Sequence, residues 1–212
     1  MYTEDELNAL KETESVVYTI TNLVSGRVVY VGKTIKTFNE RYGGCDKLDY
    51  VGIERVKYAT SNKLLKKQIE EYGVNNFKVD IVYDITQDEK KIPKRKNREE
   101  VIEQLLLLKE AEFVYKNKCY YTDGGCNIDC DDMFRMVYDT TKNKNRKEEI
   151  LKEWIIFTIK KHQKKYGHIH YAFDELLKIQ NGLWNELKQL PPYSEDVAVM
   201  LLKLDIKITI QF

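Results

Sequence analysis

Two tyrosines, an arginine and a glutamate in this chain are of the types that hydrolysis of a phosphodiester requires. Tyr18 and Tyr30 stand in short segments rich in β-branched and aromatic residues, Arg41 follows, and Glu110 belongs to a long helical pattern. The reaction needs an activated water, a cation to neutralise the phosphate oxygens, and help for the departing oxygen. A carboxylate suits Mg²⁺ or Mn²⁺, and a forked, always charged guanidinium can hold a phosphate in two contacts.

Two further residues extend this set. A free phenol has a pKa of about 10, so a tyrosine that activates water needs a cation beside it, which a metal ion, Arg41 or Lys33 could supply. Asn127 is the candidate for bracing the site by hydrogen bonds. Each residue also has an ordinary interpretation, because strand tyrosines usually pack and helix charges usually face solvent. Glu112 competes with Glu110 on the same helix.

A β-hairpin positions the two tyrosines. Residues 15–21 and 27–33 have strand composition, and Asn22, Ser25 and Gly26 punctuate the gap between them. Side chains alternate along a strand, so both phenol rings can lie on one face and form a shallow patch on the sheet. A helical pattern over residues 36–42, ended by a Gly-Gly pair, carries the arginine.

The remaining N-terminal elements follow from local patterns. Thr3 and Glu6 predict a capping box that opens a short helix to about Lys11. Residues 61–72 form a helical stripe, and residues 77–84 alternate as a half-buried strand apart from Val82. We expect an exposed basic loop over 86–98, a helix over about 99–117 with its stripe toward a core, and a turn over 121–126.

The pattern changes after residue 132, where we place a domain boundary. A polar connector over 142–147 precedes helical patterns over 148–165, 173–189 and 194–204, and 205–212 alternates like a terminal strand. We therefore expect an α+β domain over 1–132, with a small antiparallel or mixed sheet flanked by helices, and a mainly helical region over 133–212. The first part carries three more acidic than basic residues and the second four more basic than acidic, so the second is the better candidate for phosphate contact.

The order of hairpin, helix, helix, strand and long helix, with its motifs, resembles the GIY-YIG nuclease family, in particular its homing-endonuclease branch. The resemblance covers about residues 15–130. Each motif is weak by itself, and their common order makes them specific. The motifs are Val16-Val17-Tyr18, Tyr30-Val31-Gly32-Lys33, Phe38-x-x-Arg41, LLKKQIEEYGVNNF at 64–77, Glu110-x-x-Phe113-Val114 and Gly125-Cys126-Asn127.

The resemblance implies a metal-dependent endonuclease that hydrolyses DNA, with Mg²⁺ (or Mn²⁺) held by Glu110. It favours Glu110 over Glu112, because Phe113-Val114 sets the register, and it makes Tyr18 the general base or water-positioning group with Tyr30 beside it. The catalytic candidates are therefore Tyr18, Tyr30, Arg41, Glu110, Lys33 and Asn127.

The chain departs from this family in two respects. The glycine of the first motif is replaced by Val16, and the family's histidine shortly after the arginine is missing. Cys45 stands four residues after Arg41, and the tyrosines that could replace the histidine are Tyr42, Tyr50 and Tyr58. The alternative function is a catalytically inactive DNA-binding or regulatory module that keeps the nuclease-like fold.

Other features narrow the setting. The acidic start lacks a signal peptide, and no apolar run could span a bilayer, so we expect a soluble intracellular protein, cytoplasmic or in a virus-infected cell, without a membrane partner. Cys119, Cys126 and Cys130 favour reduced thiols over a zinc site, and His168 and His170 favour surface positions over metal ligands. A homing, restriction or repair role, the DNA target, and oligomerisation through the C-terminal helices all stay open.

Overall fold

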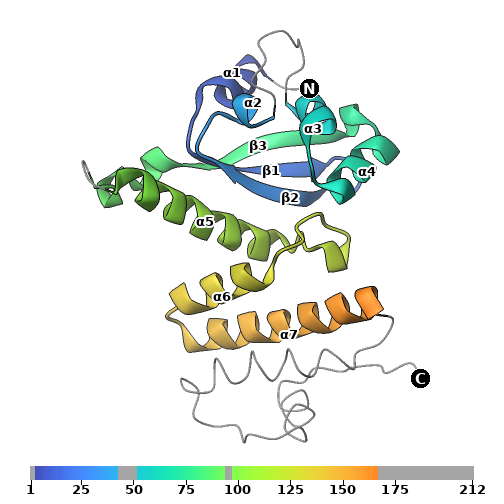
Figure 1. The fold of residues 1–212 in the computed structure, drawn as a ribbon, viewed down its shortest axis with the longest axis vertical. Coiled ribbons are helices and arrows are strands. Elements are labelled where there is room, and N and C mark those ends of the chain that lie inside the picture. Colours follow the sequence, from blue (N-terminus) through green and yellow to red (C-terminus); the bar gives the residue numbers. More distant parts are fainter. Residues whose placement is uncertain (1–2, 43–51, 94–96, 167–212) are drawn as a thin grey trace, which may run out of the picture. The chain divides into compact units, whose positions relative to one another are not determined.

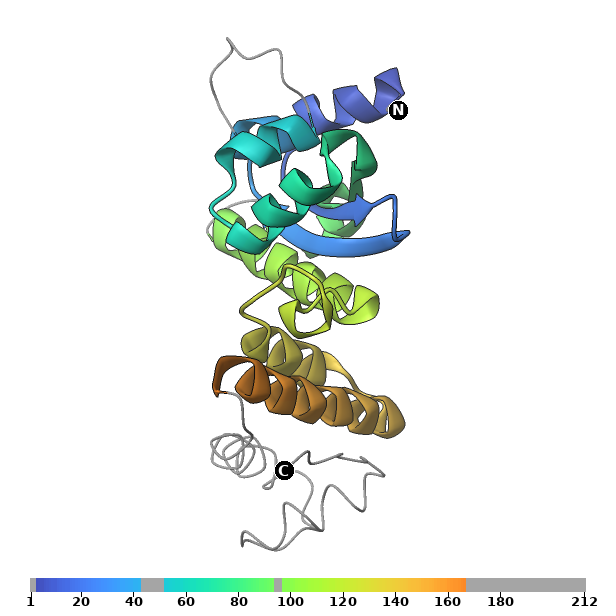
Figure 2. The same cartoon turned by 90° about the vertical axis from the view of Figure 1, so that its right-hand side faces the viewer.

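The structure, a computed structural model, describes residues 3–42, 52–93 and 97–166 (Figures 1 and 2). The chain divides into two compact units, residues 1–137 and 138–212. The N-terminal unit is α+β, with a three-stranded sheet and surrounding helices, and the described part of the second unit is helical. The boundary predicted after residue 132 falls inside helix α6 (Asp131–Thr140).

The sheet is antiparallel throughout. It consists of β1 (Val16–Asn22), β2 (Arg27–Thr34) and β3 (Phe77–Asp84) in the order β2-β1-β3, so the expected hairpin and the expected third strand are confirmed. The register shifts between Val17, which pairs with Tyr83, and Tyr18, which pairs with Ile81. Val82 is the extra residue of this bulge, which is why it interrupts the alternation in the sequence.

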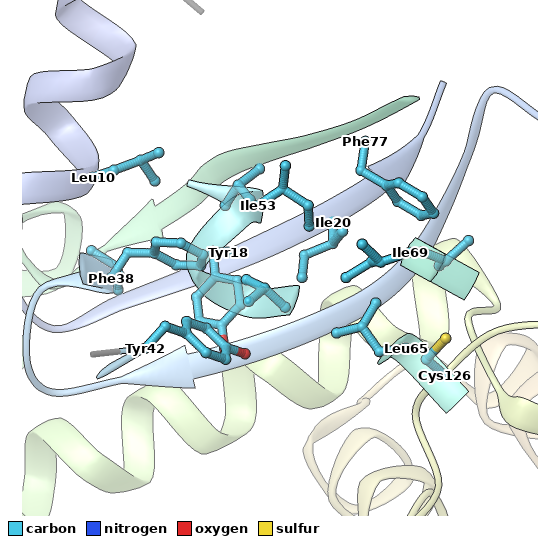
Figure 3. Close-up of a cluster of buried hydrophobic side chains, with 14 residues drawn as sticks. Leu10, Tyr18, Ile20, Phe38, Tyr42, Ile53, Leu65, Ile69, Phe77 and Cys126 are labelled. Carbon is cyan, nitrogen blue, oxygen red and sulfur yellow. The ribbon is translucent and has the colours of Figure 1, made fainter. Parts of the chain in front are cut away.

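Four helices cover one face of the sheet: α1 (Glu4–Glu12), α2 (Phe38–Arg41), α3 (Ile53–Ala59) and α4 (Lys63–Tyr72). The predicted capping box of Thr3 and Glu6 opens α1. The helices bury apolar residues in a core with alternate residues of β1 (Figure 3). Helix α3 was not predicted, because its seven residues bury only Ile53 and Val56, too few to show a helical period.

Helix α5 (Arg98–Asn117) packs against β2 and β1 on the other side of the sheet (Figure 1). Its buried residues are Leu106, Ala111 and Val114, whereas most of the stripe expected from the sequence is only half-buried. The exposed loop expected before it is partly wrong, because residues Ile85–Lys91 form the 3-10 helix η2. The Asp84 side chain accepts a hydrogen bond from the Thr86 backbone N–H and so caps this turn.

The second unit contains α7 (Lys144–Tyr166). The polar connector predicted over 142–147 is wrong from Lys144 onward, because Asn143 caps the helix by accepting a hydrogen bond from the Arg146 backbone N–H. The polar composition of residues 142–147 fits a linker and also the solvent-exposed first turn of a helix, so it did not distinguish the two. The elements predicted over 173–189, 194–204 and 205–212 lie outside the described residues. Within the described ranges, no helix combines the length and apolar character needed to cross a membrane.

Candidate functional site

Tyr18 and Tyr30 lie on one face of the β1–β2 hairpin. Tyr18 pairs with Gly32 and Ile20 pairs with Tyr30, so both phenols point to the side covered by α1–α4, with ring centroids 6.3 Å apart. Gly32 is required here because a Cβ atom at its position would come within 2.6 Å of Tyr18 Cζ and 2.8 Å of Tyr30 Cε1. The glycine of the Tyr30-Val31-Gly32 motif thus leaves room for both rings.

A third phenol completes this cluster. The Tyr42 hydroxyl lies 2.8 Å from the Tyr18 hydroxyl in a buried hydrogen bond. The Phe38 ring contacts both tyrosines, with centroid distances of 4.8 Å to Tyr18 and 5.0 Å to Tyr42 (Figure 3). Tyr18 is only 1% exposed. The expectation of a shallow patch is therefore wrong for Tyr18, because α2 and the residue after it cover its ring.

Helix α2 ends at two neighbouring residues of different chemistry, Arg41 and the C-cap Tyr42. Its start is fixed by a capping box in which the Thr37 hydroxyl accepts a hydrogen bond from the Glu40 backbone N–H and Glu40 accepts one from the Thr37 backbone N–H. The helix is one turn long, and the Tyr42 backbone N–H closes it on the Phe38 carbonyl. Arg41 is exposed while Tyr42 is buried, so one helix end supplies a solvent-facing cation and an inward-facing phenol.

Glu110 is the carboxylate of α5 whose charge acts on Tyr30 and Tyr42. Burial raises the pKa of Glu110 to about 7, while the charges of Lys33 and Arg41 act in the opposite direction. Glu112, the competing carboxylate, pairs instead with Lys109 at 2.9 Å. Glu110 and Glu112 therefore have separate environments, and the one whose pKa responds to Lys33 and Arg41 is Glu110.

Lys33 reaches α5 from β2. Its Nζ lies 3.5 Å from a carboxylate oxygen of Glu103, and its charge lowers the pKa of Glu110. Glu103 precedes Glu110 by about two helical turns, so both carboxylates lie on the same side of α5. Sequence reasoning missed Glu103, although its spacing from Glu110 would have placed it on that side.

The phenols are held in their protonated forms. Burial raises the pKa of Tyr18, Tyr30 and Tyr42, and in each case the charge of Arg41 acts to lower it. The Glu110 carboxylate raises the pKa of Tyr30 and of Tyr42, so it lies within electrostatic range of both. Arg41 thus acts as the expected cation, but desolvation raises the pKa of each phenol more than the charge of Arg41 lowers it. Five of the six candidate residues share this electrostatic cluster.

Asn127, the sixth candidate, is fully engaged in a backbone contact. Its Oδ1 accepts a hydrogen bond from the Val31 N–H at 3.0 Å, and its Nδ2 donates one to the Val31 carbonyl at 2.8 Å. The Cys126 backbone N–H also donates to the Val29 carbonyl. The segment after α5 therefore closes the outer edge of β2 as a short neighbouring strand would. Asn127 braces the strand that carries Tyr30 and Lys33.

The cysteines near this brace are buried free thiols. Burial raises the pKa of Cys119 and of Cys126 to about 12 and also raises that of Cys130. Across residues 3–42, 52–93 and 97–166, no group of three or more His, Cys, Asp and Glu side chains could hold a metal ion. Cys45, Tyr50, His168 and His170 lie outside the described residues. Comparison of the chain with protein-family models, with curated proteins and with solved structures gave no match.

Proposed function

We propose that the N-terminal unit is a metal-dependent endonuclease of the GIY-YIG type that hydrolyses DNA phosphodiester bonds. The observation that carries the proposal is the electrostatic interaction of Glu110 with Arg41, Lys33, Tyr30 and Tyr42, side chains that two other segments of the chain supply. A carboxylate with a strongly raised pKa beside two cations is a common feature of functional sites. The environment of Glu110 therefore supports a role for this carboxylate in the reaction.

The residues fit a hydrated divalent cation. Glu110 offers one hard oxygen ligand, and Mg²⁺ in protein sites commonly keeps several waters while using one or two carboxylates. The raised pKa of Glu110, about 7, means that the carboxyl group ionises readily near neutral pH once a cation is present. Bound Mg²⁺ would supply charge neutralisation at the phosphate and a more acidic water.

The remaining groups have distinct roles in this proposal. Arg41 is exposed and permanently charged, so its guanidinium contacts a non-bridging phosphate oxygen. Tyr30 is less deeply buried than Tyr18, and the charge of Glu110 acts on its hydroxyl. Of the phenols, Tyr30 is therefore the one whose hydroxyl faces the attacking water. This assigns to Tyr30 the role that the resemblance gives to Tyr18. Lys33 contributes positive charge to the same region.

The test is a plasmid-nicking assay with Mg²⁺ or Mn²⁺ on the full chain. Glu110→Gln removes the charge without changing shape, and Glu112→Gln on the same helix is its matched control because that carboxylate pairs with Lys109. We expect nicking to be lost in the first variant and kept in the second. Arg41→Ala should lower kcat by about 10²- to 10³-fold, the usual cost of removing a transition-state charge contact. Nicking that survives Glu110→Gln would contradict the proposal.

A second candidate is a DNA-binding module with this fold but no turnover. The observation that favours it is the raised pKa of all three phenols, because a general base requires the opposite shift. Salt-dependent DNA binding with no cleavage in Mg²⁺, Mn²⁺ or Ca²⁺ would support this candidate over the endonuclease. Loss of that binding in Arg41→Ala would place the DNA on the same surface.

A further inference from the structure

The tyrosine that follows Arg41 occupies a position that sequence reasoning left open. Three tyrosines were alternatives for the missing histidine, and the structure separates two of them. Tyr58 is 61% exposed on α3, whereas Tyr42 is 8% exposed and hydrogen-bonded to Tyr18. Tyr50 lies outside the described residues. Of the described alternatives, Tyr42 is therefore the one in contact with the phenol cluster.

The packing around Tyr18 restricts where its hydroxyl can turn. The Phe38 ring stands edge-on to it, and the backbone of Gly32 lies against the hydroxyl end of the ring, where no Cβ would fit. A phenol has one proton to donate and also accepts. Because Tyr18 is buried, the Tyr42 hydroxyl determines whether Tyr18 donates or accepts in their shared hydrogen bond.

This pair is connected to the exposed side of the site. The Tyr18 hydroxyl influences the protonation of Tyr30, as does that of Tyr42, and Arg41 acts on all three phenols. Tyr42 also has Glu110 within electrostatic range. A change at the Tyr42 hydroxyl therefore reaches Tyr18 through their hydrogen bond, and Tyr30 is the neighbouring phenol, with its ring centroid 6.3 Å from that of Tyr18.

We propose that Tyr42 is a positioning residue of the nuclease site, replacing the missing histidine, and that its hydroxyl fixes the orientation of the Tyr18 hydroxyl beside Tyr30. The inference rests on the proposed endonuclease function. Short helix α2 then contributes in two ways, because Arg41 binds the phosphate and the next residue orients the buried hydroxyls. Tyr42 itself does not contact the DNA.

The experiment compares Tyr42→Phe with Tyr58→Phe in the full chain, by measuring kcat and KM for nicking of a supercoiled plasmid in Mg²⁺. Both changes remove one hydroxyl, the first from a buried tyrosine that is hydrogen-bonded to Tyr18 and the second from a tyrosine that is 61% exposed. We expect Tyr42→Phe to lower kcat by about 10- to 100-fold, the usual effect of removing a residue that orients a functional side chain by a hydrogen bond. KM should be nearly unchanged. Tyr58→Phe should match the wild type in both constants.

A third variant separates positioning from a purely structural role. Tyr42→His restores a ring that can either donate to or accept from Tyr18 while the imidazole is neutral, above a pH of about 6.5, whereas the protonated ring can only donate. We expect part of the lost kcat to return above that pH and to disappear below it. Tyr42→Phe, which carries no titrating group at this position, should show no such rescue at either pH.

The outcomes are distinguishable. Wild-type kcat in Tyr42→Phe, with only a lower melting temperature, would overturn the inference and leave the endonuclease proposal intact. Equal kcat losses in Tyr42→Phe and Tyr58→Phe would also overturn it. No nicking by the wild-type chain in Mg²⁺ or Mn²⁺ would overturn the proposed function and this inference together.

Discussion

The Asn127 side chain forms with Val31 both hydrogen bonds that a neighbouring strand would form with it. Residues 96 positions apart in the sequence are thereby joined at the outer edge of β2. Because Val31 stands between Tyr30 and the close-packed Gly32, this contact holds the strand of the candidate site in register.

Replacing Asn127 with alanine should destabilise the fold, because it leaves a buried N–H and a buried C=O of Val31 without partners. The expected loss in the free energy of unfolding is about 2–4 kcal/mol, at about 1–3 kcal/mol for each unsatisfied group. Urea denaturation measures it. Asn75→Ala, at an exposed position of 3-10 helix η1 (Val74–Asn76), is the control and should change little. A loss as small as that of the control would show that water replaces the amide.

Gly32→Ala should destabilise the hairpin, because the new methyl group overlaps the rings of Tyr18 and Tyr30. Overpacking of this kind costs about 1–3 kcal/mol. Thermal unfolding measures the loss, and near-ultraviolet circular dichroism should report displaced tyrosine rings. Val24→Ala, on the exposed turn of the same hairpin, serves as the comparison. An unchanged tyrosine spectrum would mean that the sheet moves instead of the rings.

Glu110 should make the fold less stable as pH rises. Its pKa is about 7 in the folded protein against 4.5 for an ordinary glutamate, so between these values the folded state keeps a proton that the unfolded chain has released. The Glu110 contribution to the free energy of unfolding therefore falls from pH 4.5 to pH 7 and is constant above. The total change is about 3 kcal/mol.

Glu110→Gln removes this titration. Relative to the wild type, the variant should gain up to about 3 kcal/mol of stability at pH 8 and almost none at pH 4. Denaturant midpoints across this pH range measure the difference, with Glu112→Gln as the matched control. Curves that stay parallel for wild type and Glu110→Gln would show that the carboxyl group is not desolvated in the folded protein.

A divalent cation should stabilise the folded chain through the same carboxylate. Mg²⁺ binds the ionised form, so the rise in melting temperature on adding Mg²⁺ should be larger at pH 8 than at pH 6. Differential scanning calorimetry with and without EDTA checks this. The shift should vanish in Glu110→Gln and persist in Glu112→Gln. An equal shift in both variants would place the ion elsewhere.

Short-range signals in the sequence determined much of the fold. The β-branched residues and turn of the hairpin, the capping box at Thr3, the stripe of α4 ending at Gly73, and the alternation of β3 each depend on a few neighbouring residues. The break in the alternation at Val82 was visible too, but only the structure identified it as a bulge. The same signals failed for α3, whose single pair of buried residues gives no period, and for the solvated first turn of α7.

The candidate residues could also be proposed from the sequence, because residue type and order can be read without any knowledge of packing. Their environment could not be proposed in this way. That environment depends on segments far apart in the chain coming together. They decide which tyrosine contacts Tyr18, which glutamate pairs with Lys33, and whether a phenol is exposed. Desolvation and Coulombic interaction act over a few ångströms in space, so only the tertiary structure decided that Tyr18 is buried beneath Tyr42 and that Glu110 shares its surroundings with Arg41.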